Sequence, residues 1–167
     1  MGLLNPAKTT TEAAVAELAI QAAAHKVVGM AYGGDISPEE AFAFLKHNDA
    51  ILVDVRTVPE WQFTGVPDVS ATRGKLATIS WKNYPDFSTN QKFQDQLASL
   101  PDINKEVPLL FLCRSGGRSL DAAVAMTAAG YRYCFNITGG FEGDPDASGH
   151  RGTAQGWKAK KLPWKQG

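Results

Sequence analysis

The sequence predicts an α/β fold in which a central, mainly parallel sheet is covered by helices on both faces. Short apolar segments without polar alternation, such as residues 107–112, are typical of strands that are buried on both faces. Segments with helical periodicity alternate with these strands, as expected for parallel strands joined by right-handed crossovers. A chain of 167 residues, 44% of them hydrophobic, is large enough for one domain with a single core.

An amphipathic segment precedes this domain. Residues 12–28 are predicted to form a helix, because their apolar positions recur with helical period. The threonines at positions 9–11 are candidate caps for the start of this helix. We therefore divide the chain into a helical leader, residues 1–33, and a main domain, residues 34–167. The leader helix either packs on its own domain or forms a docking surface, such as a homodimer contact.

The main domain opens with a clear helix start. Ser37 is a cap, Pro38 stands at the first helical position and acidic residues follow, so we expect a helix over Pro38–His47. The later elements are assigned from periodicity and from turn residues. In order, they are a strand at 51–53 ending at Asp54, a helical turn with Glu60 and Trp61, an edge-like strand at 75–80, a helix at 90–100, a strand at 107–112, a helix at 119–129 and a strand at 133–137.

Two features of the sequence allow more than one interpretation. Trp61 either packs as an ordinary core aromatic or forms part of a pocket wall. The polar segment 144–155 is either a solvated loop or a lid in which His150 and Arg151 select the acceptor of a transferred group, and the loop is the simpler interpretation.

A cysteine stands at the end of the most apolar strand and is followed by a glycine-rich turn and a helix. This arrangement directs several backbone N–H groups and the positive end of the helix dipole to one place. Together with two neighbouring guanidinium groups, they favour the anion, so the Cys113 thiol is expected to be largely thiolate at neutral pH. We interpret Cys113 as a nucleophile at the rim of an anion cradle.

The expected binding residues are those of the loop itself: Arg114, Ser115, Gly116, Gly117, Arg118 and Ser119. The first arginine lies beside the nucleophile and can meet an anionic substrate, whereas the second opens the helix and can fix the loop's geometry. The two glycines are expected at positive φ, which costs glycine little. The serines can donate hydroxyl hydrogen bonds, although Ser119 equally suits a helix cap.

Two charged residues follow the neighbouring strand. Asp54 and Arg56 stand at a strand end, where open α/β sheets place functional groups. They are expected either to support the cysteine loop, with Asp54 pairing an arginine or capping loop N–H groups, or to form a local salt bridge that shapes only their own turn.

Three motifs resemble those of the rhodanese (sulfurtransferase) family, in the family's order. They are the loop at 113–119, the strand end at 53–56 with Glu60 and Trp61, and the Gly-Gly segment at 136–141. The resemblance spans roughly residues 34–165. It implies a rhodanese-like sandwich, with Trp157, Leu162 and Trp164 packing the tail back on the domain. It also implies transfer of a sulfur from a donor such as thiosulfate, through a Cys113 persulfide, to cyanide or a thiol acceptor, with no cofactor.

Two other functions remain open at this level. Phosphatases and arsenate reductases of similar architecture place five residues between cysteine and arginine, whereas four separate Cys113 from Arg118 here. The shorter loop should close more tightly around the sulfur, and the resemblance implies that it suits a persulfide, whereas a phosphate would be crowded. Rhodanese-like domains also serve as inactive binding or regulatory modules, but these often lack the cysteine.

Composition and spacing argue against several partners. Seventeen basic and seventeen acidic residues give no net charge, so nothing indicates nucleic acid or an anionic membrane. Two cysteines are too few for a disulfide framework, which favours a reducing, cytoplasmic location. Cys134 is expected to be buried and inert, about four residues along the sheet from Cys113. The histidines are scattered, so no metal site is expected.

Overall fold

The computed structural model describes residues 6–167, with side chains from residue 12 onwards. Its centre is a five-stranded sheet in which all neighbouring strands are parallel. In spatial order, the strands are β1 (Gly34–Ile36), β6 (Cys134–Ile137), β5 (Leu109–Leu112), β2 (Ile51–Asp54) and β4 (Lys75–Thr78). The predicted α/β fold is thus confirmed, and the strand expected at an edge lies at an edge.

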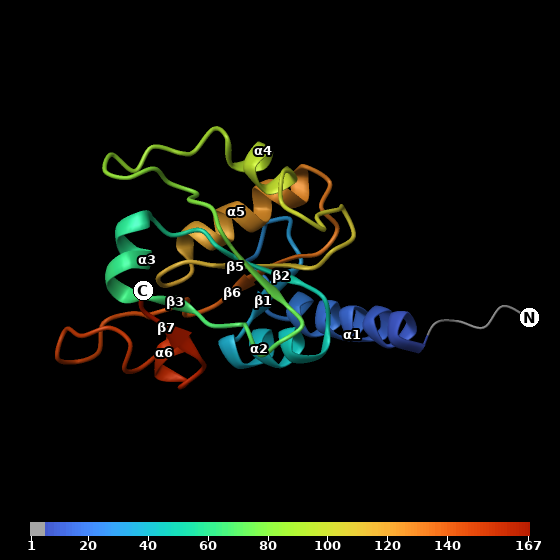
Figure 1. Ribbon diagram of the computed structural model, residues 1–167, viewed down its shortest axis with the longest axis horizontal. Coiled ribbons are helices and arrows are strands. Elements are labelled where there is room, and N and C mark those ends of the chain that lie inside the picture. Colours follow the sequence, from blue (N-terminus) through green and yellow to red (C-terminus); the bar gives the residue numbers. More distant parts are fainter. Residues whose placement is uncertain (1–5) are drawn as a thin grey trace, which may run out of the picture.

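Helices cover both faces of the sheet (Figure 1). One face carries α4 (Phe93–Ala98) and α5 (Gly117–Ala128), and the other carries α1 (Pro6–Ala23), α2 (Pro38–His47) and α6 (Gly156–Ala159). Successive side chains of β5 point to opposite faces, so Leu110 and Leu112 join one apolar core, and Leu109 and Phe111 join the other. A strand buried on both faces has no polar alternation, which explains the sequence pattern.

The helix α2 has the bounds that its sequence predicts. The hydroxyl of Ser37 accepts a hydrogen bond from the Glu40 amide at 3.1 Å, and the Glu40 carboxylate accepts one from the Ser37 amide at 3.0 Å. This reciprocal capping box satisfies backbone donors that have no partner inside the helix.

The leader helix α1 differs from its prediction at both ends. It begins at Pro6 and ends at Ala23, so residues 9–11 lie within the helix and do not precede it as caps. Proline is well suited to a first helical turn, because its missing N–H would have no partner there. Residues 24 and 25 close the helix in a turn, and Gly29 follows at a φ of 84°. The predicted continuation to residue 28 was therefore wrong.

The face of α1 that carries Val15, Leu18 and Ala22 is buried in the core of its own domain. Gly34 allows the close approach, since a Cβ at this position would lie 2.0 Å from the Ala22 carbonyl oxygen, and its φ is 127°. The leader thus packs on its own sheet, as the simpler interpretation held. A homodimer through this helix remains a prediction.

Several other elements are shorter than predicted or were not expected. Helix α4 starts only at Phe93, because the Asn90 side chain accepts a hydrogen bond from the Lys92 amide and forms a turn before the helix. The three-residue strand β1 was not predicted. Nor was the antiparallel pair of β3 (Val66–Pro67) and β7 (Trp164–Lys165), which lies beside α3 (Val58–Thr64).

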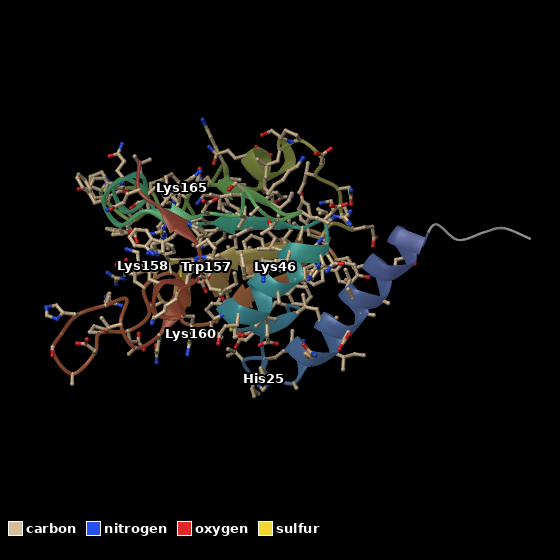
Figure 2. The ribbon with its side chains drawn as sticks, turned by 60° about the horizontal axis from the view of Figure 1, so that its bottom comes forward. His25, Lys46, Trp157, Lys158, Lys160 and Lys165 are labelled. Carbon is tan, nitrogen blue, oxygen red and sulfur yellow. The ribbon has the colours of Figure 1, made fainter. Side chains whose placement is uncertain are left out.

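The C-terminal tail packs on the domain, as expected. Trp157 of α6 is fully buried, and its ring lies 5.7 Å from that of Phe42 on α2. Lys46, also on α2 and labelled with Trp157 in Figure 2, places its Nζ 5.2 Å from the centre of the Phe42 ring. Trp164 makes an edge contact with Phe141, with ring centroids 6.2 Å apart. Within residues 6–167, no helix has the length and apolar character needed to cross a membrane.

Candidate active site

Cys113 directly follows β5, the central strand of the sheet, and α5 begins four residues later at Gly117. The turn between them is tight because Gly116 adopts a φ of 118° and a ψ of −11°, a conformation that residues with a Cβ rarely adopt. Gly117 opens the helix without a positive φ, so the prediction of two left-handed glycines was correct only for Gly116.

Two donors lie within hydrogen-bond distance of the Cys113 sulfur, among the residues that the structure describes. The Gly116 amide nitrogen is 3.1 Å from Sγ, and the Ser119 hydroxyl oxygen is 3.2 Å from it. Both come from the first turn of α5 or the residue before it, where the helix dipole is positive. The thiol does not stand at an open rim, because Cys113 is only 1% exposed.

A chain of hydrogen bonds continues from this sulfur to the edge of the sheet. The Ser119 hydroxyl lies 2.6 Å from Oδ1 of Asn136 on β6, and the Asn136 amide donates to Asp35 on β1 at 3.1 Å. The same Asp35 oxygen accepts a bond from the Tyr32 hydroxyl at 2.9 Å.

These contacts fix the direction of each bond. A carboxylate only accepts, so the Asn136 NH₂ must face Asp35, and its carbonyl oxygen must face Ser119. The hydroxyl of Ser119 has a single proton, which can serve either the Asn136 oxygen or the Cys113 sulfur. Ser119 is therefore not a helix cap but a donor that is shared between the sulfur and the neighbouring strand.

The Gly-Gly segment after β6 holds the backbone of the cysteine loop. The Phe141 amide donates to the Cys113 carbonyl at 2.8 Å, and the amides of Glu142 and Gly143 both donate to the Arg114 carbonyl at 3.0 Å. A Cβ on Gly140 would lie 2.4 Å from the Cys113 carbonyl oxygen. Only glycine therefore fits at the second glycine position of the motif without a steric clash.

Arg118 is held by Glu60 of α3. Its Nη1 and Nη2 donate to the two carboxylate oxygens at 2.7 and 2.9 Å, and the Thr57 hydroxyl also donates to this carboxylate. Burial raises the pKa of Glu60, but the hydrogen bonds and charge of Arg118 lower this pKa by more, so the carboxyl stays ionised. The guanidinium thereby joins the start of α5 to α3, and its role in fixing the geometry of the loop remains a prediction.

Asp54, at the end of β2, and Arg56, in the turn that follows, form a fully buried ion pair. The Arg56 Nε and Nη2 donate to the two Asp54 oxygens at 2.9 and 2.7 Å, and further bonds reach Thr64 and the Gly65 carbonyl. The pair thus shapes its own turn, and no hydrogen bond joins it to the cysteine loop within residues 6–167. Its contact toward the loop is indirect, since the guanidinium carbon lies 4.3 Å from the ring centre of Phe141.

The other predicted loop residues are wholly or partly exposed. Arg114 is exposed, and its guanidinium makes no ion pair among the side chains that the structure describes. Ser115 is half-buried and Gly117 is exposed. Trp61 does not line the cavity beside the two loop arginines but a separate cavity that Ser80 and Asn90 also line.

Two residues at the site were missed as functional candidates from the sequence. Glu60 was assigned to a helical turn and to one of the rhodanese-like motifs without a role at the site, although it stands at the third position of α3, where acids favour the dipole. Asn136 was likewise part of a motif without a role, and a polar residue within the apolar strand β6 was the available signal.

Cys134 lies at the opposite end of the sheet from Cys113. It begins β6 and pairs in register with Leu109, the first residue of β5. Four residues along a strand correspond to about 13 Å, too far for a disulfide, whose Cα atoms lie within about 7 Å. Both cysteines are free thiols. Among residues 12–167, no group of three or more histidine, cysteine or acidic side chains could hold a metal ion.

Comparison with known proteins agrees with this architecture. The family model of the rhodanese-like domain matches residues 37–144, more than half of the chain, and the chain therefore belongs to the rhodanese-like domain family. The crystal structure of Rv0390 from M. tuberculosis is 44% identical, covers 82% of this chain and 100% of its own, and superimposes with a TM-score of 0.75.

Two curated relatives extend the comparison. The uncharacterized protein RC0915 of Rickettsia conorii is 38% identical over 131 residues, which cover 78% of this chain and 95% of the relative. Thiosulfate sulfurtransferase 18 of Arabidopsis thaliana is 42% identical over 52 residues, which cover 31% of this chain and 37% of that protein.

Proposed function

We propose that this protein is a sulfurtransferase that carries a sulfane sulfur on Cys113. The observation that carries the proposal is the pair of donors on Sγ, the Gly116 amide at 3.1 Å and the Ser119 hydroxyl at 3.2 Å. Such donors stabilise a sulfur anion, and a thiolate and a persulfide are both anions. Family membership and the similarity to a plant protein named as a thiosulfate sulfurtransferase support this choice.

The reaction has two steps. The Cys113 thiolate attacks the outer sulfur of a donor such as thiosulfate. The sulfur–sulfur bond of the donor breaks, and its electron pair leaves with sulfite. The guanidinium of the exposed Arg114 can stabilise the negative charge of this leaving group. The transferred sulfur is then the outer atom of a Cys113 persulfide. A thiol or cyanide attacks that atom, and the electron pair of the broken bond returns to Cys113.

The surrounding residues have separate parts in this reaction. The Ser119 proton can turn from Asn136 to the sulfur when the sulfur is an anion. The Glu60–Arg118 pair and the Asp54–Arg56 pair keep the loop and its neighbouring turn in place. All of these groups belong to the protein itself, so the proposal needs no cofactor.

One observation favours a second candidate function, a binding or regulatory module. Cys113 is 1% exposed, so a donor can reach the sulfur only if the atoms that cover it move aside. A module that never carries sulfur would need no such movement. The two functions differ in a single measurable product, the persulfide.

The test is the intact mass of the protein after incubation with thiosulfate. We expect an increase of one sulfur atom in the wild type and in Cys134→Ser, and none in Cys113→Ser. Loss of the nucleophile should lower thiosulfate-to-cyanide turnover by at least about 10³-fold. Absence of both the adduct and the turnover with any sulfur donor would support the module, and hydrolysis of an aryl phosphate would support a phosphatase.

A further inference from the structure

A cavity of about 630 Å³ lies beside the cysteine loop: Arg114 and Arg118 of the loop line it, whereas the buried Cys113 does not. Its walls come from segments far apart in the sequence: the cysteine loop, the start of α3, the loop after β4 and the polar segment 144–155. Cavities of roughly 300–1,000 Å³ hold organic ligands rather than small inorganic ions. The space is therefore much larger than thiosulfate or cyanide requires.

The charge of the cavity is positive. Four basic and two acidic side chains line it, an excess of two positive charges. Glu60 is already bound on both oxygens to Arg118. Arg114, Lys82 and Arg151 make no ion pair among the side chains that the structure describes, which leaves Glu142 as the opposing acid. Cations without acidic partners at a cavity wall favour an anionic ligand.

Arg151 is held in place although it belongs to a surface loop. Its Nη1 donates to the Gly143 carbonyl at 2.6 Å. The loop is also ordered from within, because Asp146 accepts bonds from the amides of Ser148 and His150 at 2.8 and 3.0 Å. The segment 144–155, visible as the projecting loop before α6 in Figure 2, therefore presents Arg151 to the cavity. His150 is exposed and does not line it.

Two aromatic rings form the apolar part of the cavity. Tyr84 and Phe87 are 61% and 52% exposed, and their rings meet edge to face with centroids 6.4 Å apart. Large exposed rings beside a charged pocket are typical of surfaces that bind a partly apolar ligand. Anionic groups and an organic body are thus expected in the same molecule.

We propose that this cavity is the acceptor subsite and that it binds an organic thiol bearing carboxylates, of about the size of a short peptide. The proposal rests on the proposed sulfurtransferase function. In this step, the acceptor thiolate bonds to the outer sulfur of the Cys113 persulfide. The bond between the two persulfide sulfurs breaks, and its electron pair stays on Cys113. The acceptor leaves as an organic persulfide anion, and its thiol proton has gone to solvent.

The first experiment measures binding without chemistry. S-methylglutathione, a thioether that cannot accept sulfur, is titrated calorimetrically into the wild type and into Cys113→Ser. We expect both proteins to bind it, and we expect Arg151→Gln and Phe87→Ala each to weaken binding about tenfold. The matched controls are Arg132→Gln, an exposed arginine elsewhere, and Phe63→Ala, an exposed ring on α3 outside the cavity. Neither control should change binding.

The second experiment measures transfer from the persulfide form. We expect Arg151→Gln to lower the ratio of kcat/KM for glutathione to that for cyanide about tenfold, with no such change in Arg132→Gln.

Three results would overturn the subsite: no binding of the thioether at millimolar concentrations, equal binding of neutral 2-(methylthio)ethanol, or equal weakening by Arg151→Gln and Arg132→Gln. If Cys113 takes up no sulfur while the thioether still binds as described, the sulfurtransferase proposal fails and the anion-binding cavity stands.

Discussion

The two cysteines of this protein are equally buried and yet differ in their surroundings. Cys113 is 1% exposed and Cys134 is 0% exposed, and both belong to the same apolar core. Cys113 follows the carboxyl end of β5 and lies near two hydrogen-bond donors at the start of α5. Cys134 opens β6, and its thiol donates to an acceptor, the Tyr131 carbonyl, at 3.6 Å.

This difference follows from the direction of the chain and not from the depth of burial. The carboxyl end of a parallel strand leads into the N-terminus of a helix, where amide groups are free. The amino end of a strand follows the C-terminus of a helix, where carbonyl groups are free and the dipole is negative. Burial raises the pKa of Cys134 to about 11, and the Thr127 hydroxyl and the charge of Lys105 offset this only in part. The same residue type is thus suited to chemistry at one end of the sheet and to packing at the other.

Selective alkylation tests the contrast most directly and should show the largest effect. At pH 8, a thiol with a pKa near 11 is about 0.1% thiolate, so Cys134 should react about 10²–10³-fold more slowly in the native protein than in urea. Cys113 should react first, because it lies in the loop after β5, whereas Cys134 lies within the buried strand β6, and loops open more readily than buried strands. Iodoacetamide rates in Cys113→Ser and Cys134→Ser, each with one thiol, give the comparison. Equal alkylation rates of the two thiols in the native protein would contradict this contrast.

Substitution of Gly140 should lower the stability of the protein through its contact with the cysteine loop. Gly140→Ala places a Cβ against the Cys113 carbonyl at a φ of 60°, so we expect a loss of about 2–4 kcal/mol in the free energy of unfolding. Gly117→Ala is the matched control, since a Cβ there meets nothing within 4 Å, and it should change stability by less than about 1 kcal/mol. Urea unfolding measures both. A neutral Gly140→Ala would show that the segment after β6 does not hold the loop.

The raised pKa of Cys134 should make the free energy of unfolding fall at alkaline pH. Its pKa is raised from 9.0 to about 11, so the folded state holds a proton that the unfolded state releases. This contribution to stability is complete below pH 9 and is lost as the pH rises through 11. We therefore expect the wild type to lose about 2–3 kcal/mol more than Cys134→Ala between these pH values. Urea unfolding of both proteins at pH 8 and pH 10.5 measures most of this difference, and parallel losses would contradict it.

Local sequence predicts the parts of the fold that local physics determines. The capping box fixes α2, and the apolar run fixes β5, so both were predicted closely. Strand β1 has three residues and is defined by its pairing with β6, about a hundred positions away. The pair of β3 and β7 likewise exists only because two distant segments meet. Short elements stabilised by tertiary contacts leave no periodicity to detect.

The candidate site divides in the same way. The loop from Cys113 to Ser119 is contiguous, so its residues could be named from the sequence. Glu60 holds Arg118 from 58 positions away, and Asp35 meets Asn136 across 101 positions. Side chains that act through such distant partners become visible only once the chain is folded. The inward placement of Arg151 was likewise only one of two interpretations of its loop.

Hydrogen bonds connect Tyr32 and Asp35 to Ser119 through Asn136, so residues before position 37 belong to the surroundings of the candidate site. The family match starts at residue 37, after Asp35 and the whole of β1. A protein shortened to that boundary would keep every residue of the cysteine loop but lose the carboxylate that sets the Asn136 amide. That amide could then turn its NH₂ toward the serine and deprive the hydroxyl of its acceptor. The family match therefore begins one edge strand later than the set of residues that holds the hydrogen bonds around Ser119.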